Sequence, residues 1–279
     1  NIKILEQPPL TSNIERNSLT VIRQNFVEPR TPGKPNPNHA EATIEAIKRG
    51  VQFVKNGQCS AICTMPISKS ILKEGANFPF PGHTEYLAHL DESKNYAMML
   101  VNKYLRVVPV TIHIPIKDIT KYLNTELIEK TIKTTHQELN RRFSISNPNI
   151  WVSGLNPHAG ENGTIGDEEQ KFIIPIIKKL QSEGYNLLGP LSADTMFYGK
   201  KRPRFDAAIC MYHDQALIPI KTLDFHSSVN LTIGLSFIRT SPDHGTAFDI
   251  AGKNLANPTS TIEAIKLAWN MAKKEQKDR

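Results

Sequence analysis

Short apolar runs and longer amphipathic stretches alternate along most of this chain. Runs of five or six apolar residues are typical of buried strands, and apolar residues at every third or fourth position form one face of a helix. The pattern predicts strands over 60–64, 97–101, 107–112, 150–155 and 207–211. It predicts helices from Asn38 to about residue 55 and over 117–140, 167–182 and 260–273. This alternation predicts a layered α/β fold with a largely parallel sheet.

Short motifs predict where one helix begins and where a loop lies. Ser260 is followed three residues later by Glu263, which is the spacing of an N-terminal capping box. Periodicity is weak and turn residues are frequent between residues 5 and 37. Within that stretch the prolines of 29–37 fix φ and remove backbone donors, so we expect an ordered loop there.

Composition narrows the class of protein. The chain has 279 residues, 39% of them hydrophobic and 22% charged, which suits one large domain or two closely associated lobes. No apolar run reaches the roughly 20 residues of a membrane-spanning helix, and no signal peptide is recognisable. The net charge of +7 is spread along the chain without the aromatic and basic stripe of a nucleic-acid surface. We expect a cytoplasmic protein with buried thiols at Cys59, Cys63 and Cys210, a small anionic substrate, and neither a membrane nor a nucleic acid as partner.

Three of the predicted strands are each followed by a histidine. His113 follows the strand over 107–112, His158 lies in the polar cluster after 150–155, and His213 follows 207–211. Binding loops of open α/β sheets lie at the carboxyl ends of strands, and imidazole is a good ligand for zinc and similar metals. Each histidine alone is more often a surface or core hydrogen-bonding residue than a metal ligand, but three at matching places favour a divalent-metal site. Asp194 is a further candidate, either to orient a ligand or to act as a base.

Two polar, glycine-containing segments are candidate binding loops. The first, 80–85, precedes a helix, so its backbone N–H groups could meet an anion with His83 and Thr84 as side-chain donors, although an ordinary turn explains it as well. The second, 239–252, is too polar for core and too apolar for a linker. Cationic and polar contacts to a phosphate could come from Lys221, Asn230 and Arg239.

Several common nucleotide and hydrolase motifs are missing from the sequence. It contains no G-x-G-x-x-G after a strand, no P-loop, no H-E-x-x-H and no G-x-S-x-G. This argues against a Rossmann dinucleotide site, a kinase-type phosphate cradle and a serine hydrolase.

Five motifs, in this order and at these separations, resemble the 4-hydroxythreonine-4-phosphate dehydrogenase family of the vitamin B6 pathway. They are Gly82-His83-Thr84-Glu85, Asn156-Pro157-His158-Ala159-Gly160-Glu161, Ala193-Asp194-Thr195, Tyr212-His213-Asp214-Gln215 and Asp243-His244-Gly245-Thr246-Ala247. The resemblance runs from about residue 36 to residue 270. The segment 244–258 also resembles the loop with which isocitrate and isopropylmalate dehydrogenases bind NAD or NADP without a Rossmann fold.

The resemblance implies a two-lobed α/β/α sandwich like that of isocitrate and isopropylmalate dehydrogenases, with the active site in the cleft. It implies interleaved lobes, with a metal- and substrate-binding lobe over roughly 59–190 and dinucleotide-side segments over roughly 1–58 and 191–279. It also implies a homodimer whose subunit interface completes the metal site. One divalent metal, zinc, magnesium or cobalt, would be held by His113, His158 and His213.

The resemblance also assigns the other site residues by position. Substrate contacts would come from His83, Thr84, Lys221, Asn230 and Arg239. The catalytic residues would be Asp194 and Lys69, which would lie close to the reacting centre. NAD or NADP would be held by His244, Gly245, Thr246 and Asn257.

The implied reaction is the NAD(P)-dependent oxidation of 4-phosphooxy-L-threonine to 2-amino-3-oxo-4-phosphooxybutanoate. That product decarboxylates to 3-amino-2-oxopropyl phosphate, on the way to pyridoxine 5'-phosphate. One alternative keeps the chemistry and changes the substrate to D-threonate or D-erythronate 4-phosphate or to a cis-dihydrodiol. The other is an inactive, truncated metal-binding remnant, because the family's first βα unit with its glycine- and proline-rich loop is expected to be missing before Asn1. Ser192 and Ala216 are mild departures, where the family usually has proline and glycine.

Overall fold

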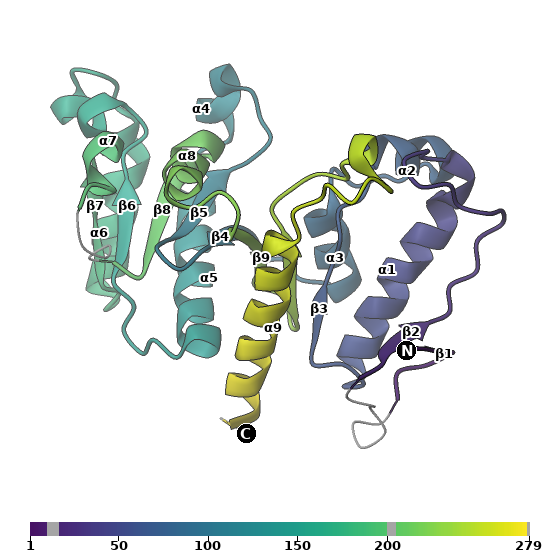
Figure 1. Ribbon diagram of the computed structural model, residues 1–279. Helices are drawn as coiled ribbons and strands as arrows, with labels where there is room; N and C mark the ends of the chain where they lie inside the picture. The colour runs from purple at the N-terminus through teal and green to yellow at the C-terminus, as the bar shows by residue number, and fades with distance from the viewer. Residues whose placement is uncertain (10–16, 200–204, 278–279) are drawn as a thin grey trace.

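The structure, a computed structural model, describes residues 1–9, 17–199 and 205–277. It has two lobes, with the C-terminal helix α9 (Thr259–Lys277) between them (Figure 1). The first lobe carries α1 (Ala40–Lys55), α2 (Lys69–Ala76) and α3 (His83–Asp91). The second carries α4 (Ile119–Tyr122), α5 (Thr125–Phe143), α6 (Ile174–Ser182), α7 (Ala193–Met196) and α8 (His213–Leu223). None of the helices in these described ranges is long and apolar enough to cross a membrane.

One eight-stranded sheet runs through both lobes. Its order is β3 (Ala61–Cys63), β10 (Ile238–Pro242), β9 (Val229–Ile233), β4 (Ala97–Val101), β5 (Arg106–Thr111), β8 (Ala207–Tyr212), β6 (Ile150–Ser153) and β7 (Leu187–Leu191). Four of the seven neighbouring pairs are parallel, which confirms the prediction of a largely parallel sheet. The three antiparallel pairs are consecutive and join β10, β9, β4 and β5, where the sheet passes from one lobe to the other.

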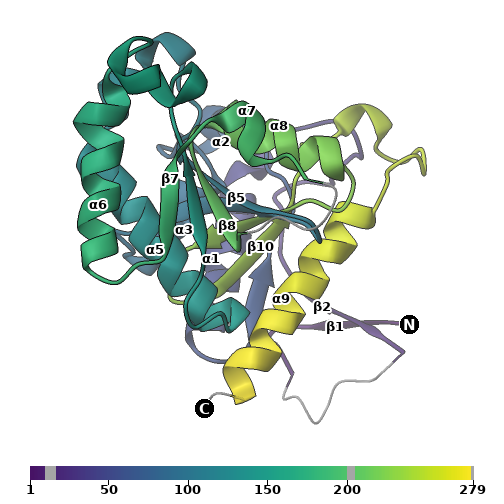
Figure 2. The same ribbon diagram turned by 90° about the vertical axis from the view of Figure 1, so that its left-hand side faces the viewer.

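Helices cover both faces of the sheet in the second lobe. Figure 2 shows α5 and α6 on one face and α7 and α8 on the other. Ile209 of β8 and Ile132 of α5 are fully buried on the first face, and Cys210 of β8 packs with Ile220 of α8 on the second. Strands buried on both faces consist of nearly continuous apolar residues, and for this reason most strands of the second lobe could be predicted from the sequence. The first lobe has a separate core that includes Val51 of α1.

The strand predictions are confirmed to within two residues, but the sequence reading missed five strands. Among these, β9 and β10 contain the polar residues Asn230 and Arg239, which interrupt their apolar pattern. The parallel pair β1 (Ile2–Leu5) and β2 (Leu19–Ile22) lies in the segment interpreted as turn-rich. Residues 10–16 of that segment lie outside the described ranges.

Helix ends depart from the predictions where an asparagine side chain caps the backbone. The helix predicted over 117–140 is wrong as one element, because Asn124 begins α5 by accepting a hydrogen bond from the backbone N–H of Leu127 at 2.8 Å. Asn36, not Asn38, supplies the side-chain acceptor before α1, from the N–H of Asn38 at 2.9 Å. The helix predicted over 167–182 contains a π-helical turn, Glu169–Ile173, before α6.

The predicted capping box at Ser260 is also wrong. Ser260 Oγ accepts a hydrogen bond from the N–H of Asp243 at 3.0 Å and donates one to the carbonyl of Ser228 at 2.7 Å. The hydroxyl therefore joins the start of α9 to the two strands β9 and β10 instead of capping its own helix.

Candidate active site

A cavity of about 490 Å³ lies between the two lobes. Three helices begin at its wall: α2 with Lys69, α3 with His83 and α8 with His213. Strands β9 and β10 contribute Asn230 and Arg239. Because helix N-termini present unpaired N–H groups, three of them around one cavity favour a negatively charged ligand.

Arg239 is the most buried cation of this cavity, with 3% of its surface exposed. Its guanidinium donates to Thr64 Oγ1 from Nε at 3.1 Å and from Nη2 at 2.8 Å, and to Thr232 Oγ1 from Nη1 at 2.8 Å. Among the residues that the structure describes, no carboxylate forms an ion pair with it. Burial lowers the pKa of Arg239 to about 10, so the group stays charged at neutral pH. A buried guanidinium that only hydroxyl groups contact directly is a receptor for an anion, although the charge of Glu85 acts on it from the same cavity.

His83 and Asn230 present polar atoms that have no partner. His83 Nε2 and Asn230 Oδ1 are buried and make no hydrogen bond within the described parts of the chain. Burial, helped by the charge of Arg239, lowers the pKa of His83 to about 3, so its imidazole is neutral. Buried polar atoms are nearly always satisfied, so these two atoms on one cavity wall point to a ligand that supplies their partners.

The remaining charges of the cavity form a mixed wall. Lys221 Nζ lies 3.0 Å from Asp243 Oδ2, an ion pair with both side chains partly buried. Lys69 and Glu85 also line the cavity. Three cations therefore face two carboxylates. Arg239 is the fully buried one of the three, and it forms no ion pair within the ranges that the structure describes.

Two of the three predicted metal ligands lie together. The rings of His113 and His213 have centroids 5.8 Å apart at the cavity wall. His213 Nδ1 lies 2.7 Å from Asp214 Oδ1, which leaves Nε2 for a ligand. Burial lowers the pKa of His113, with smaller effects from Lys69 and His213. A neutral imidazole is the form that binds a metal.

His158 lies elsewhere, and so does Asp194. His158 belongs to the turn Pro157–Gly163, where five consecutive residues, 158–162, have left-handed backbone angles. Glu169 holds the start of this turn, because its Oε1 accepts the N–H groups of Leu155 and Asn156 at 2.8 and 2.7 Å. Helix α7, which carries Asp194, packs against the same turn, and both side chains are exposed. The described residues of a single chain contain no group of three His, Cys, Asp or Glu side chains that could hold a metal.

The predicted dinucleotide loop begins at the cavity mouth. His244 and Gly245 line the cavity, whereas Thr246 and Asn257 lie further along the loop. A Cβ added at Gly245 would meet no atom within 4 Å, so this backbone borders open space. An extended ligand could therefore pass from the cavity onto the loop.

Sequence reasoning missed several residues of this site. The stretch 239–252 was judged too polar for core, but Arg239 to Pro242 form the buried strand β10. Thr64 and Thr232 were missed as partners of Arg239, and Asp243 as the partner of Lys221. For Asp243 the only signal was its place in one of the quoted motifs, next to His244.

Comparison with known proteins places this chain in a family. The model of the pyridoxal phosphate biosynthetic protein PdxA matches residues 1–268, so the chain belongs to the PdxA family, as its motifs predicted. A 4-hydroxythreonine-4-phosphate dehydrogenase from Roseobacter denitrificans is 54% identical over 269 residues, which cover 96% of this chain and 82% of that protein. One from Paracoccus denitrificans is 52% identical over 258 residues, 91% of this chain and 80% of that protein.

Solved structures show the same fold. The 4-hydroxythreonine-4-phosphate dehydrogenase of Klebsiella pneumoniae has a TM-score of 0.87 at 36% identity, covering 97% of this chain and 83% of its own. A terephthalate 1,2-cis-dihydrodiol dehydrogenase from Burkholderia xenovorans has a TM-score of 0.67 at 26% identity, with 97% and 83% covered. The two-lobed α/β architecture is thus shared by proteins named for different substrates.

Proposed function

We propose that this protein, like its named relatives, is a 4-hydroxythreonine-4-phosphate dehydrogenase. It would oxidise 4-phosphooxy-L-threonine with NAD or NADP to 2-amino-3-oxo-4-phosphooxybutanoate, which loses CO₂ to give 3-amino-2-oxopropyl phosphate. The observation that carries the proposal is the buried guanidinium of Arg239, which forms no ion pair with a carboxylate of the described residues. It shares a cavity wall with His83 Nε2, a buried atom that makes no hydrogen bond to those residues. These groups require an anionic ligand with hydrogen-bonding oxygens.

The phosphate and carboxylate of this substrate need two separate receptors. Arg239 and the N-terminus of α3, with His83 and Thr84, form one. Lys221 and Asn230 form the other, with Asp243 holding Lys221 in place. The proposal assigns no anion to either receptor individually, since both have cationic and neutral donors.

The residues present fit a divalent metal only when a second subunit contributes. His113 and His213 supply two imidazoles, and the third ligand would be His158 of a second copy in a homodimer. The exposed, left-handed turn that carries His158 suits insertion into a neighbouring cleft. When bound, a zinc, cobalt or magnesium ion would lower the pKa of the substrate hydroxyl and polarise the neighbouring carbonyl. Two or three imidazoles favour zinc or cobalt over magnesium.

The proton transfers fall to two side chains. Asp194 would arrive with His158, because α7 packs against the same turn, and its carboxylate would take the hydroxyl proton. Lys69 lines the cavity, and its ammonium would return a proton to carbon after CO₂ leaves. His83 stays neutral and donates or accepts hydrogen bonds without exchanging its proton.

The dinucleotide would accept the hydride while lying along the loop from His244 to Asn257. Gly245 borders open space at the cavity mouth, which allows the close backbone approach that a flat ring requires. The proposed division of the chain, with a metal- and substrate-binding lobe over roughly 59–190 and dinucleotide-side segments over roughly 1–58 and 191–279, has to be widened on this proposal. The metal and substrate site also takes His213, Lys221, Asn230 and Arg239 from the last segment.

One relative supports a second candidate substrate class. The fold is shared with a protein named for a cis-dihydrodiol, which carries no phosphate. Arg239 and Lys221 suit a substrate with two anionic groups. The phosphate and carboxylate of 4-phosphooxy-L-threonine meet that need, and so do the two carboxylates of a terephthalate dihydrodiol. The 4-phosphates of D-threonate and D-erythronate have the same two anionic groups for these cations and carry a hydroxyl in place of the amino group.

Formation of reduced dinucleotide by the purified chain, with added zinc, cobalt or magnesium, tests the proposal. The substrates are 4-phosphooxy-L-threonine, D-threonate 4-phosphate and a cis-dihydrodiol, and the control is His113→Ala. We expect the highest kcat/KM on the phosphorylated amino acid and no turnover by the control. Preference for the sugar acid would reassign the substrate, and metal binding without any turnover would favour the inactive remnant.

A further inference from the structure

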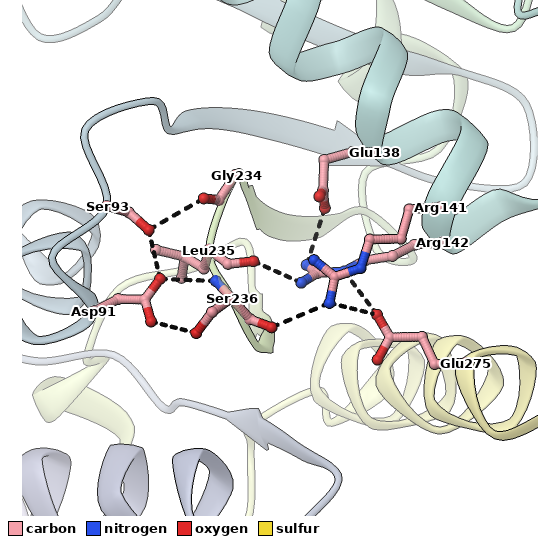
Figure 3. Close-up of polar contacts among 9 residues, drawn as sticks. All are labelled: Asp91, Ser93, Glu138, Arg141, Arg142, Gly234, Leu235, Ser236 and Glu275. Atoms are coloured by element: carbon pink, nitrogen blue, oxygen red, sulfur yellow. Dashed lines mark hydrogen bonds and ion pairs between the residues drawn. The ribbon is translucent and has the colours of Figure 1, made fainter. Parts of the chain in front are cut away.

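The end of α3 that lies away from the cavity is bonded to the turn between β9 and β10. Asp91, the last residue of α3, has a side chain that is 1% exposed. Its Oδ2 accepts the N–H of Ser236 at 2.7 Å and the hydroxyl of Ser93, and its Oδ1 accepts the hydroxyl of Ser236 (Figure 3). Ser93 Oγ also lies 3.2 Å from the carbonyl of Gly234. One carboxylate therefore ties the helix to the hairpin turn.

The same turn is fixed from its other side. Arg142 of α5 donates from Nη2 to the carbonyl of Leu235 at 2.8 Å, and Arg141 donates to the carbonyl of Ser236 at 3.1 Å (Figure 3). Arg142 is 1% exposed and is paired with Glu138 at 3.0 Å and with Glu275 of α9 at 3.4 Å. The turn is thus a fixed point to which α3 is attached.

Both elements that meet at this turn lead to the cavity. Helix α3 begins with His83 and Thr84 at the cavity wall and ends with Asp91, a length of about 12 Å. Strand β10 begins two residues after Ser236, and its second residue is Arg239. The bond between Asp91 and Ser236 therefore sets where the N-terminus of α3 stands relative to the guanidinium.

We infer that Asp91 is a positioning residue, which holds His83 and Thr84 in register with Arg239 through the length of α3. This inference rests on the proposed function, in which those residues bind the phosphorylated substrate. The side-chain hydrogen bonds and the ion pair of Asp91 within the described ranges go to Ser93, Ser236 and Lys55, none of which lines the cavity. The effect of Asp91 on binding would therefore pass through the helix. A displacement of about 1 Å at a binding group is enough to cost up to roughly a hundredfold in rate.

Three variants separate positioning from general stability. Asp91→Ala removes every bond to the turn, whereas Asp91→Asn keeps an acceptor for the N–H of Ser236 and a polar group for the hydroxyls. The stability control is Ile177→Ala in α6 of the other lobe. Ile177 is only 2% exposed, so its truncation leaves a cavity in the core far from the substrate site. KM values for 4-phosphooxy-L-threonine and for the dinucleotide are measured at temperatures below each Tm, together with the calorimetric Kd of the phosphorylated substrate.

We expect Asp91→Ala to raise the substrate KM and Kd by about tenfold or more, with the dinucleotide KM changed by less than about twofold. Asp91→Asn should stay within about threefold of the native substrate KM, and Ile177→Ala should lower Tm alone. If Asp91→Ala does not fold, Ser236→Ala removes one bond to the carboxylate and should raise the substrate KM by a smaller factor. A lower Tm with an unchanged substrate KM, or an equal rise in both KM values, would overturn the inference.

Arg239→Lys, measured in the same assay, distinguishes this failure from failure of the proposed function. If Arg239→Lys raises the substrate KM and Asp91→Ala does not, the positioning role is wrong and the substrate site stands. If neither variant changes it, the substrate site itself is misplaced and both proposals fall.

Discussion

The guanidinium of Arg239 is anchored on the hydroxyl of Thr64, which accepts from Nε at 3.1 Å and from Nη2 at 2.8 Å. Thr64 directly follows the edge strand β3, so the arginine spans from its own strand to the next. A hydroxyl orients the guanidinium without neutralising it, and the charge remains for a ligand. This is the arrangement on which the substrate assignment depends.

Arg239→Lys should raise the KM for 4-phosphooxy-L-threonine strongly. A lysine keeps the charge but loses the planar fork and the bonds to Thr64 and Thr232. Loss of a charged hydrogen-bonded contact costs on the order of 1.5–3 kcal/mol, which is roughly ten- to hundredfold in kcat/KM. Steady-state kinetics at fixed dinucleotide concentration measure the effect, and a KM within twofold of the native value, on the order of 0.4 kcal/mol, would contradict the assignment.

Mixed dimers test whether the metal site is shared between subunits. His113→Ala and His158→Ala should each be inactive, because each site would lack one ligand. Neither change should alter folding, since neither histidine belongs to a buried hydrophobic core cluster. Refolding or exchanging the two variants together should restore activity, because a mixed dimer contains one site with all three histidines. Metal content and turnover of the mixture are the readouts. A mixture as inactive as its parents would show that no ligand crosses between subunits.

Gly245→Val should weaken dinucleotide binding with little effect on stability. A Cβ at this position meets no atom of the chain within 4 Å, and the backbone there is not left-handed, so the side chain would project into open space at the cavity mouth. If the dinucleotide lies on this loop, the valine collides with it. The expected result is a raised KM for NAD or NADP, an unchanged Tm, and a smaller effect on the substrate KM. A dinucleotide KM equal to the native one would place the cofactor elsewhere.

The buried histidine of the cavity should make the protein sensitive to acid. The folded pKa of His83 is lowered to about 3 from an ordinary value of 6.5, so between these limits the unfolded chain binds a proton that the folded chain does not. Stability is therefore lost as the pH falls below about 6.5, by up to about 1.4 kcal/mol per pH unit from this group. His83→Gln should remove that contribution. Urea unfolding of both proteins at pH 5, 6 and 7 tests this, and parallel pH dependences would show that His83 is already charged in the fold.

The elements that could be predicted from the sequence are those buried on both faces. Strand β8 is a continuous apolar run and was predicted almost to the residue, and β4 was predicted with its observed ends. Strands β9 and β10 were missed because their buried positions include Thr232 and Arg239, whose polar groups are satisfied by one another across the hairpin. A hydrogen bond between two strands does not change the local pattern of apolar and polar residues, so it cannot be predicted from that pattern.

Only part of the candidate site could be predicted from the sequence as well. The ends of β5 and β8 deliver His113 and His213 to one place, as the strand-end argument predicted. His158 ends up elsewhere, because the turn after β6 takes a left-handed path pinned by Glu169, fourteen residues from Leu155. The role of Asp91 could not be predicted either, because its partner Ser236 is 145 residues away in the sequence.

The most direct test of the central claim compares 4-phosphooxy-L-threonine with 4-hydroxy-L-threonine, the same compound without its phosphate, as substrates of the native protein. The first compound has two anionic groups for the two receptors, one formed by Arg239 with the start of α3 and one by Lys221 with Asn230, and the second compound has only its carboxylate. We predict that removing the phosphate lowers kcat/KM by roughly ten- to hundredfold or more, equivalent to one or more charged hydrogen-bonded contacts. Equal turnover of the two compounds would contradict the phosphate assignment and favour a substrate of the dihydrodiol type.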